Sequence, residues 1–389
     1  MLLCASQSLG NGHALDGEIV LRNIGSPELG DRPGMVLASP LGRQMLASYV
    51  DWKESICDAS PGYHELARSW TGSQLGLLDH FLIREWRNIS ADLVRRAFRH
   101  AVMDTSDWRW RIAEASERQL IEDLASATGD YGFNLENEAV WGLTHIGAAE
   151  LAPVAVALVS AAGAGQWWNS VSLTDQRFVG WDDRPPLRGA DLESTVEAAS
   201  RELRSSNGGR GPNADWRSSN YGSLWWSSPS FAEESWTVNR VAGIWSTGLL
   251  YFTDAYGPGD DPDRLIASPA SPGLWQLSMD PSARIYEVSG PADWAALVNR
   301  FPCDVSRTHG DDWSRWSGAP GPWILPDWSR VAESYDGVHV SIGGYISSCG
   351  LGIPVHDGYS MLAGWLPGAT LWLKDVIVTV TQLTGRQLS

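Results

Sequence analysis

The stretch PDWSRVAESYDGVHVSIGGYIS, residues 326–347, decides the fold, since it places a short helix directly before a strand. Pro326 followed by Asp327 is a pattern typical of a helix start. After that helix, apolar and polar residues alternate as they do in a strand. We therefore expect a short helix over 326–335 and one strand over 337–347, a combination that indicates an α+β domain.

The rest of the second half carries both helical and strand patterns. The expected elements are helices over 191–206 and 291–301, a pair of strands over 236–254, and single strands over 283–288 and 370–383. The tetrapeptide Asp-Trp-Ser-Arg occurs at 312–315 and at 327–330, and we interpret both copies as helix starts. The Gly-, Asn- and Ser-rich segment 207–223 is expected to be a mobile loop.

The first half indicates helices throughout. The expected helices cover 41–56, 74–88, 91–103, 107–125 and 136–162. Serines stand before several of them, and Ser39 followed by Pro40 is the clearest start. Six of the 22 tryptophans lie in residues 1–150, and the rest lie in the second half. We therefore predict an α+β protein, with a mainly helical, bundle-like region over 1–165 and a Trp-rich mixed α+β domain over 166–389.

The composition argues against several classes of function. The chain has 389 residues and a formal charge of −17, so it repels phosphate backbones, and no nucleic-acid partner is expected. The longest apolar stretch, 148–165, is interrupted by Glu150 and Pro153, so we expect a buried helix there and no membrane span. The four cysteines form no CxxC pair, and neither a disulfide framework nor a metal site is expected. We recognise no signal peptide and expect a cytoplasmic protein.

Histidines and carboxylates are the candidates for acid–base chemistry. His339 falls on the polar side of the expected strand, opposite Val338 and Val340, and Asp336 ends the turn before it. A histidine beside a carboxylate suits a general base and the group that orients it. The alternative is an ordinary half-exposed strand histidine. His309, in an expected polar loop, is a second candidate, as a ligand-binding residue.

Tryptophan and serine clusters offer another kind of site. Trp313 and Trp316 are spaced to share one helical face and are candidates to stack on a flat ligand, although large indoles also fill cores. Ser227 and Ser228 follow a Trp pair in the sequence WWSSPS. They fit either a site that binds a ribose or positions an acid, or an ordinary strand end.

Short motifs of the second half resemble known kinds of protein. WWSSP, IYEVSGPADWAAL, PDWSRVAESYDGVHV and LAGWLPGATLWLKDV resemble a Trp-rich type of protein common in GC-rich actinobacteria. The same region resembles ADP-ribosyltransferase domains, which pair a serine-containing strand with a later YDGV-like segment. That resemblance implies Ser227 and Ser228 as the serine motif, Arg217 as the arginine that meets the phosphates of NAD, Asp336 as part of the YDGV segment, and NAD as the cofactor.

The chain departs from this family at the catalytic glutamate, which should lie at or just before the last strand. The sequence LPGATLWL has no acid at that place, and the first acid after it is Asp375. A developing ribosyl cation needs an anion fixed close by. Asp375, Glu287 or Glu333 would therefore have to take the place of that glutamate.

Three classes of function fit the sequence. The first is an NAD- or nucleotide-using transferase built on the C-terminal half. The second is a small-molecule tailoring enzyme of specialised metabolism, with acid–base chemistry near His339 and Asp336. The third is a non-catalytic binding or structural protein whose indoles fill the core. A small-molecule ligand is the expected partner.

Overall fold

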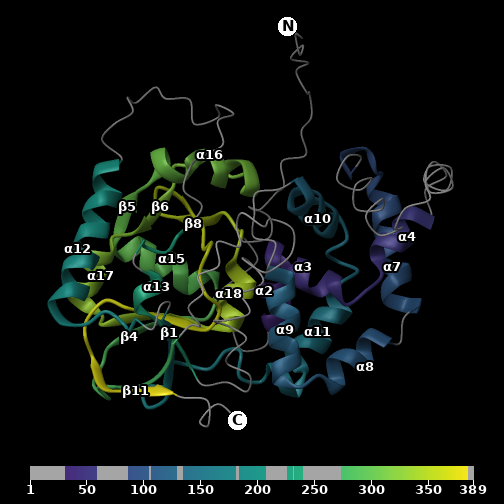
Figure 1. The fold of residues 1–389 in the computed structure, drawn as a ribbon. Coiled ribbons are helices and arrows are strands. Elements are labelled where there is room, and N and C mark those ends of the chain that lie inside the picture. Colours follow the sequence, from purple (N-terminus) through teal and green to yellow (C-terminus); the bar gives the residue numbers. More distant parts are fainter. Residues whose placement is uncertain are drawn as a thin grey trace, which may run out of the picture.

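The structure is a computed structural model of the chain (Figure 1). It describes residues 31–58, 86–104, 107–128, 135–180, 184–206, 226–230, 232–239 and 273–383. The predicted loop over 207–223, most of the predicted helix over 74–88, and the second half of the predicted strand pair over 236–254 lie outside the described residues.

Helices make up nearly all of the first half and continue between the strands of the second. The described helices and 3-10 turns are α2 (Arg32–Ala38), α3 (Pro40–Ser48), α4 (Trp52–Asp58), η2 (Trp86–Asn88), α7 (Ala91–Asp104), α8 (Asp107–Glu114), α9 (Glu117–Thr128), α10 (Leu135–Ile146), α11 (Ala152–Ser160), η3 (Ala162–Ala164), α12 (Gly189–Ser206), α13 (Ala232–Ser235), α15 (Pro291–Arg300), α16 (Ser306–Ser317), α17 (Trp328–Ser334) and α18 (Ile342–Ser348).

Seven strands of the second half form one mixed sheet. In spatial order they are β11 (Ile377–Leu383), β3 (Gly273–Met279), β1 (Gln176–Gly180), β2 (Trp236–Asn239), β10 (Ala369–Trp372), β7 (Gly337–Val340) and β4 (Ile285–Val288). β4 and β7 run parallel, and the other neighbouring pairs run antiparallel. Two further pairs stand apart from this sheet, β5 (Pro302–Asp304) with β6 (Ile324–Pro326) and β8 (Ile353–Val355) with β9 (Gly358–Ser360). The predicted α+β class is confirmed.

Several predicted helix starts are confirmed because local chemistry determines them. The Ser39 hydroxyl accepts a hydrogen bond from the Gly42 backbone N–H and caps α3, with Pro40 in the first turn. Pro291 occupies the first turn of α15 in the same way, and Asp327 stands at the N-cap of α17. The first Asp-Trp-Ser-Arg copy, at 312–315, is no helix start, since it lies inside α16.

The predicted strand over 337–347 is wrong in its second half. The strand ends at Val340, and Ser341 then caps α18 by accepting a hydrogen bond from the Gly344 N–H at 3.0 Å. An alternating pattern followed by Gly-Gly resembles a longer strand. The serine cap is the local signal that the pattern hides.

Other predicted elements are also divided or were missed. The predicted final strand over 370–383 is two strands, β10 and β11, which lie at different places in the sheet. β3 was not predicted from the sequence. The predicted helices over 41–56, 107–125 and 136–162 each break into two, for example after Ser48 and after Glu114. In these places the periodic pattern continues across a turn.

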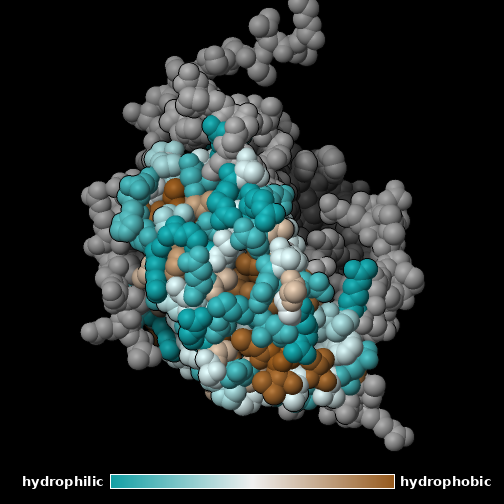
Figure 2. Space-filling model, turned by 90° about the vertical axis from the view of Figure 1, so that its left-hand side faces the viewer, coloured by the Kyte–Doolittle hydropathy of each residue, from teal (hydrophilic) through white to brown (hydrophobic). Residues whose placement is uncertain are grey.

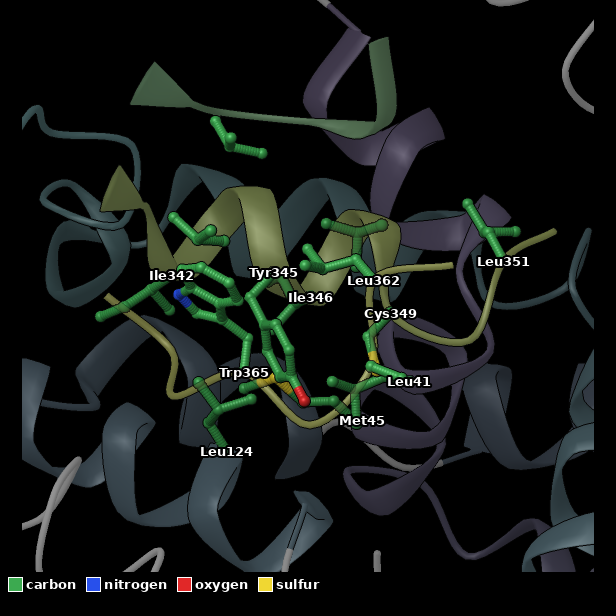
Figure 3. Close-up of a cluster of buried hydrophobic side chains, with 14 of the residues drawn as sticks. Leu41, Met45, Leu124, Ile342, Tyr345, Ile346, Cys349, Leu351, Leu362 and Trp365 are labelled. Carbon is green, nitrogen blue, oxygen red and sulfur yellow. The ribbon is translucent and has the colours of Figure 1, made fainter. Parts of the chain in front are cut away.

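The helix α18 stands at the centre of one core shared by both halves of the chain. Its seven residues are all buried. Figure 3 shows Tyr345, Ile346 and Cys349 surrounded by Leu41 and Met45 of α3, by Leu124 of α9, and by Leu362 and Trp365 from the end of the chain. The Ser39 hydroxyl donates a hydrogen bond to the Cys349 carbonyl at 2.9 Å and so fastens α3 to the end of α18.

Tryptophans fill much of the core beneath the sheet. The Trp365 ring lies between those of Trp236, Trp294 and Trp328, with ring centroids 5.8, 6.1 and 5.9 Å away. All four side chains are buried. These indoles are structural, because each buries a large apolar area against the others.

The outer face on the side of α12 and β4 is mostly hydrophilic, and hydrophobic side chains gather near its lower edge (Figure 2). Val378 of the edge strand β11 is one of the exposed large hydrophobic residues of the described chain. Across the described ranges, no helix combines the length and the apolar character needed to cross a membrane.

The Ser39 hydroxyl is expected to stabilise the fold through two hydrogen bonds. Ser39→Ala removes the cap of α3 and leaves the buried Cys349 carbonyl without this donor, so the free energy of unfolding should fall by about 1–3 kcal/mol. Urea denaturation followed by tryptophan fluorescence measures this change. Ser205→Ala, on the exposed last turn of α12, is the control and should change the unfolding free energy by less than about 0.5 kcal/mol. Equal effects of the two substitutions would contradict the role of Ser39.

Candidate functional site

A row of polar side chains crosses the middle of the sheet on one face. His339 of β7 lies opposite Glu287 of β4 and Thr370 of β10, and Thr370 lies opposite Thr237 of β2. Residues that pair across neighbouring strands share a face, so these four side chains follow one another along the row. Gln176 of β1 continues it by accepting a hydrogen bond from the Thr237 hydroxyl.

The His339 ring has a hydrogen-bond partner at Nδ1, whereas no described group meets Nε2 in hydrogen-bond geometry. The side chain is 1% exposed, and its Nδ1 lies 2.9 Å from the Thr370 hydroxyl. Nε2 is buried as well. Burial lowers the pKa of His339 to about 4. The nearby backbone carbonyl of Asn169 favours the protonated ring and has the smaller effect on this pKa. The imidazole is therefore neutral at physiological pH.

The segment 166–173, which we call the covering segment, is tied to the strands by backbone and side-chain hydrogen bonds. The Ser172 N–H donates to the Asn239 side chain at 2.7 Å, and the Met279 N–H donates to the Leu173 carbonyl at 2.7 Å. The Gly343 N–H of α18 donates to the Trp167 carbonyl at 2.7 Å. The covering segment therefore connects β2 and β3 with the start of α18.

A small, partly open pocket of about 20 Å³ lies between the covering segment and the sheet. Its polar lining residues are Gln166, Trp167, Asn169, Asn239, His339 and Ser341, and apolar residues of β2, α18 and the turn before β10 complete it. Gln166 and Asn169 are exposed, so the pocket is reached from solvent on their side. Its volume suits a single small polar group.

Glu287 lies next to His339 in the row and holds the covering segment. Its carboxylate accepts a hydrogen bond from the Val171 N–H at 3.0 Å. Burial raises the pKa of Glu287 to about 7, although the Val171 hydrogen bond alone would lower it, and the charge of Asp293 adds to the rise. Glu287 thus changes its charge near neutral pH while His339 stays neutral.

Asp336, directly before β7, forms ion pairs with Arg284, directly before β4, and with Lys374, which follows β10. Its carboxylate lies 3.0 Å from Arg284 Nη2 and 3.3 Å from Lys374 Nζ, and it accepts the Arg284 backbone N–H at 2.8 Å. Burial alone would raise the pKa of Asp336, but these hydrogen bonds and the Arg284 charge hold it below its ordinary value. Thr370, not Asp336, orients His339.

His309 resembles His339 in burial but has both ring nitrogens engaged. It lies inside α16, where a polar loop was expected, and is 1% exposed. Nδ1 lies 2.8 Å from the Thr308 hydroxyl and Nε2 lies 3.1 Å from the Trp226 carbonyl. Burial lowers the pKa of His309 to about 4. Its contacts fix segment 226–230 to α16.

The serine pair is engaged by the backbone of one neighbouring segment. The Ser227 hydroxyl donates to the Ala363 carbonyl at 2.7 Å and accepts the Ala363 N–H at 3.0 Å. The Ser228 hydroxyl donates to the Gly364 carbonyl at 3.2 Å. Trp226, which precedes them, is 44% exposed. These hydrogen bonds attach segment 226–230 to the backbone of residues 363 and 364.

The two candidate tryptophans pack against other aromatic rings. Trp313 is buried, with the His309 ring centroid 4.5 Å away and that of Trp323 5.3 Å away. Trp316 meets Trp141 of α10 edge to face at 4.7 Å. Neither residue lines the pocket beside His339, and Ser227 does not line it either.

The remaining candidates divide between the described and undescribed parts of the chain. Arg217 lies outside the described residues. Of the three acids that would replace a family glutamate, Asp375 pairs with Arg188 at 3.0 Å, Glu333 is exposed on α17, and Glu287 lies beside His339. Within the described ranges, no group of three or more His, Cys, Asp or Glu side chains could hold a metal ion.

Trp167, Thr370 and Glu287 belong to the site, although the sequence did not assign them to it. Glu287 stood out only as one of three acids that could replace the family glutamate, and neither Trp167 nor Thr370 was a candidate. Their meeting depends on strand register, which a single sequence does not specify.

Comparison of the chain with protein-family models, with curated proteins and with solved structures finds no match.

Glu287→Gln is expected to stabilise the protein at alkaline pH. Because the folded-state pKa of Glu287 is raised, its favourable contribution is complete below the ordinary glutamate value near 4.5 and is lost as pH rises through about 7. Glutamine stays neutral, so at pH 8 the variant should unfold with about 1–2 kcal/mol more free energy than the wild type, and the gap should close toward pH 4. Urea denaturation at several pH values measures it. Glu333→Gln, at an exposed position, should show no such trend; a gap independent of pH would refute the assignment.

Asp336→Asn should weaken the fold in the opposite pH range. The folded-state pKa of Asp336 is lowered, so its contribution is present above the ordinary aspartate value near 4 and is lost as pH falls through the folded value. The variant should therefore be less stable than the wild type at pH 7 and approach it as pH falls below 4. Thermal unfolding at pH 3 to 7 tests this, with the exposed Asp357→Asn as the control. A variant as stable as the wild type at pH 7 would contradict the ion-pair role.

Proposed function

We propose that the protein is an enzyme that acts on a small, uncharged molecule, with His339 as the group that contacts it. One observation carries this proposal: the buried imidazole has an unpartnered Nε2 and lines a pocket reached from solvent. Buried polar atoms are rarely left without a hydrogen bond unless a ligand, water or functional need accounts for them. His309 shows what the same residue looks like in a purely structural setting, with both nitrogens engaged.

The chemistry available to His339 follows from its surroundings. Thr370 fixes the ring by Nδ1, so Nε2 keeps one direction. A neutral imidazole donates or accepts a hydrogen bond without adding charge to the pocket. Negative charge that develops on a bound oxygen would raise the pKa of the ring and strengthen its hydrogen bond. This suits acid–base assistance to a substrate that is neutral when it binds.

Glu287 is a positioning residue in this proposal. Its carboxylate holds Val171, and the same covering segment supplies Gln166, Trp167 and Asn169 to the pocket wall. Ionisation of Glu287 above about pH 7 strengthens its hold on the Val171 N–H, because a charged acceptor bonds more strongly. The shape of the pocket thus depends on a group that does not line it.

The place of the pocket in the sheet supports a ligand site beside His339. The pocket lies where β2 and β7 end and where β10 begins. In open sheets with parallel strands, ligands bind beyond the carboxyl ends of the strands. We further propose a cytoplasmic enzyme, which the free, buried thiol of Cys303 supports.

A ligand screen tests the proposal. Thermal-shift measurements with uncharged metabolites, aromatic metabolites, nucleotides and NAD should give hits among the uncharged compounds, and NMR of the mixtures should show that a hit is converted. His339→Gln should lower kcat/KM for that compound by about 100- to 10,000-fold. His309→Gln, equally buried and outside the pocket, is the matched control and should keep the activity.

Two outcomes would overturn this function. Binding without conversion of any hit favours a binding protein, the class in which the indoles are purely structural. Binding of NAD that survives His339→Gln favours a transferase with its site elsewhere. No contact among the described residues favours the transferase, since Ser227 and Ser228 are engaged by backbone groups.

A further inference from the structure

Two buried nitrogen atoms that meet no hydrogen-bond partner among the described residues belong to side chains that line the pocket. One is His339 Nε2, and the other is Trp167 Nε1. Both residues line the pocket of about 20 Å³. An indole N–H is only a donor, so it needs an acceptor, whereas a neutral imidazole nitrogen is either a donor or an acceptor. Two such groups at one small pocket indicate a polar occupant.

Two other polar side chains of the lining, the half-buried Asn239 and the buried Ser341, are already engaged. The Asn239 amide oxygen accepts hydrogen bonds from the Ser172 N–H and from Gln176, and its nitrogen donates to the Ser170 carbonyl. The Ser341 hydroxyl caps α18. The two unpartnered nitrogens are therefore the groups best placed to recognise an occupant.

The lining of this pocket holds no charged residue. An ion of either sign would lose much of its hydration there without gaining a counter-charge, which costs several kcal/mol. The nearest titratable neighbour in the row, Glu287, turns its carboxylate to Val171. The occupant is therefore uncharged.

We infer that the pocket binds a hydroxyl group of an uncharged ligand, with the Trp167 indole donating to its oxygen and His339 Nε2 as its second partner. The Nδ1 contact with Thr370 is compatible with either tautomer of the ring. A hydroxyl both donates and accepts, so it pairs with Nε2 in both tautomers, whereas a carbonyl oxygen pairs in only one. An ammonium group cannot accept from the indole. The inference rests on the proposed function in one respect, since it takes the hydroxyl to belong to the substrate.

A series of small probes tests the inference on the full, wild-type chain. Methanol, formamide, formate and methylammonium are similar in size and differ in charge and hydrogen-bonding capacity. Each is titrated while the histidine ring nitrogens and the indole N–H groups are followed by ¹⁵N NMR. Methanol should shift the signals of His339 and Trp167 in a saturable way and leave those of His309 unchanged.

Other results of the titration would contradict the inference. A response to formate or methylammonium in place of methanol would show a charged ligand, and a response to formamide alone would show a carbonyl group. No saturable response to methanol would mean that the pocket holds only water. Equal shifts at His309 and His339 would show a general solvent effect and not a site.

A matched pair of variants assigns the donor. Trp167→Phe removes the indole N–H and should weaken methanol binding at His339 by about two- to tenfold, the usual worth of one hydrogen bond. Trp236→Phe removes another buried and unpartnered indole N–H, one outside the pocket, and should leave methanol binding unchanged. If Trp167→Phe does not fold, the probe series on the wild type still decides the inference.

The inference and the proposed function fail in different ways. Methanol binding at His339 with no conversion of any screened compound would leave the hydroxyl site standing and overturn the enzyme. Conversion that depends on His339 without a response to methanol would leave the enzyme standing and overturn the hydroxyl site.

Discussion

The close approach of α18 to its neighbours is the constraint on which the rest of the structure depends. A Cβ atom on Gly343 would lie 2.1 Å from the Trp168 ring, and one on Gly344 would lie 2.3 Å from the Val288 carbonyl oxygen. With glycine at both places, α18 packs directly against the covering segment and the end of β4. The first contact brings the Trp167 backbone to the helix, and the second joins the helix to the parallel strand pair. These contacts place Ile342 of α18 and Trp167 of the covering segment next to each other, and both residues line the pocket.

Sequence reasoning identified the parts of the fold that local chemistry determines. Proline in the first turn sets the helix starts at Pro40 and Pro291, and the Ser39 side chain caps the first of these helices. Asp327 stands at the N-cap of α17 as expected, but its side chain makes no capping hydrogen bond. Gly343 and Gly344 are required because Trp168 and Val288, which are far away in the sequence, pack closely against them. An alternating pattern with two glycines therefore indicated a strand, and the helix that organises the core was missed.

The same distinction explains what could be predicted of the candidate site. The alternation around His339 correctly separated its side from that of Val338 and Val340. The sequence neighbour Asp336 was the expected partner, but it lies at the start of the strand and pairs with Arg284 and Lys374. The actual neighbours, Thr370 and Glu287, are set by strand register, and Trp167 is set by a chain crossing. Strand register and the crossing of distant chain segments cannot be inferred from a single sequence, because it does not show which residues are in contact.

The tryptophans that fill the core beneath the sheet also have an optical consequence. Trp236, Trp294, Trp328 and Trp365 come from four separate segments. The ring centroids of the first three lie about 6 Å from that of Trp365. Indoles this close couple their electronic transitions and exchange excitation energy. The near-ultraviolet circular dichroism of the protein therefore contains a built-in spectroscopic signature of how β2, α15, α17 and the segment before β10 are assembled, and no introduced chromophore is needed to read it.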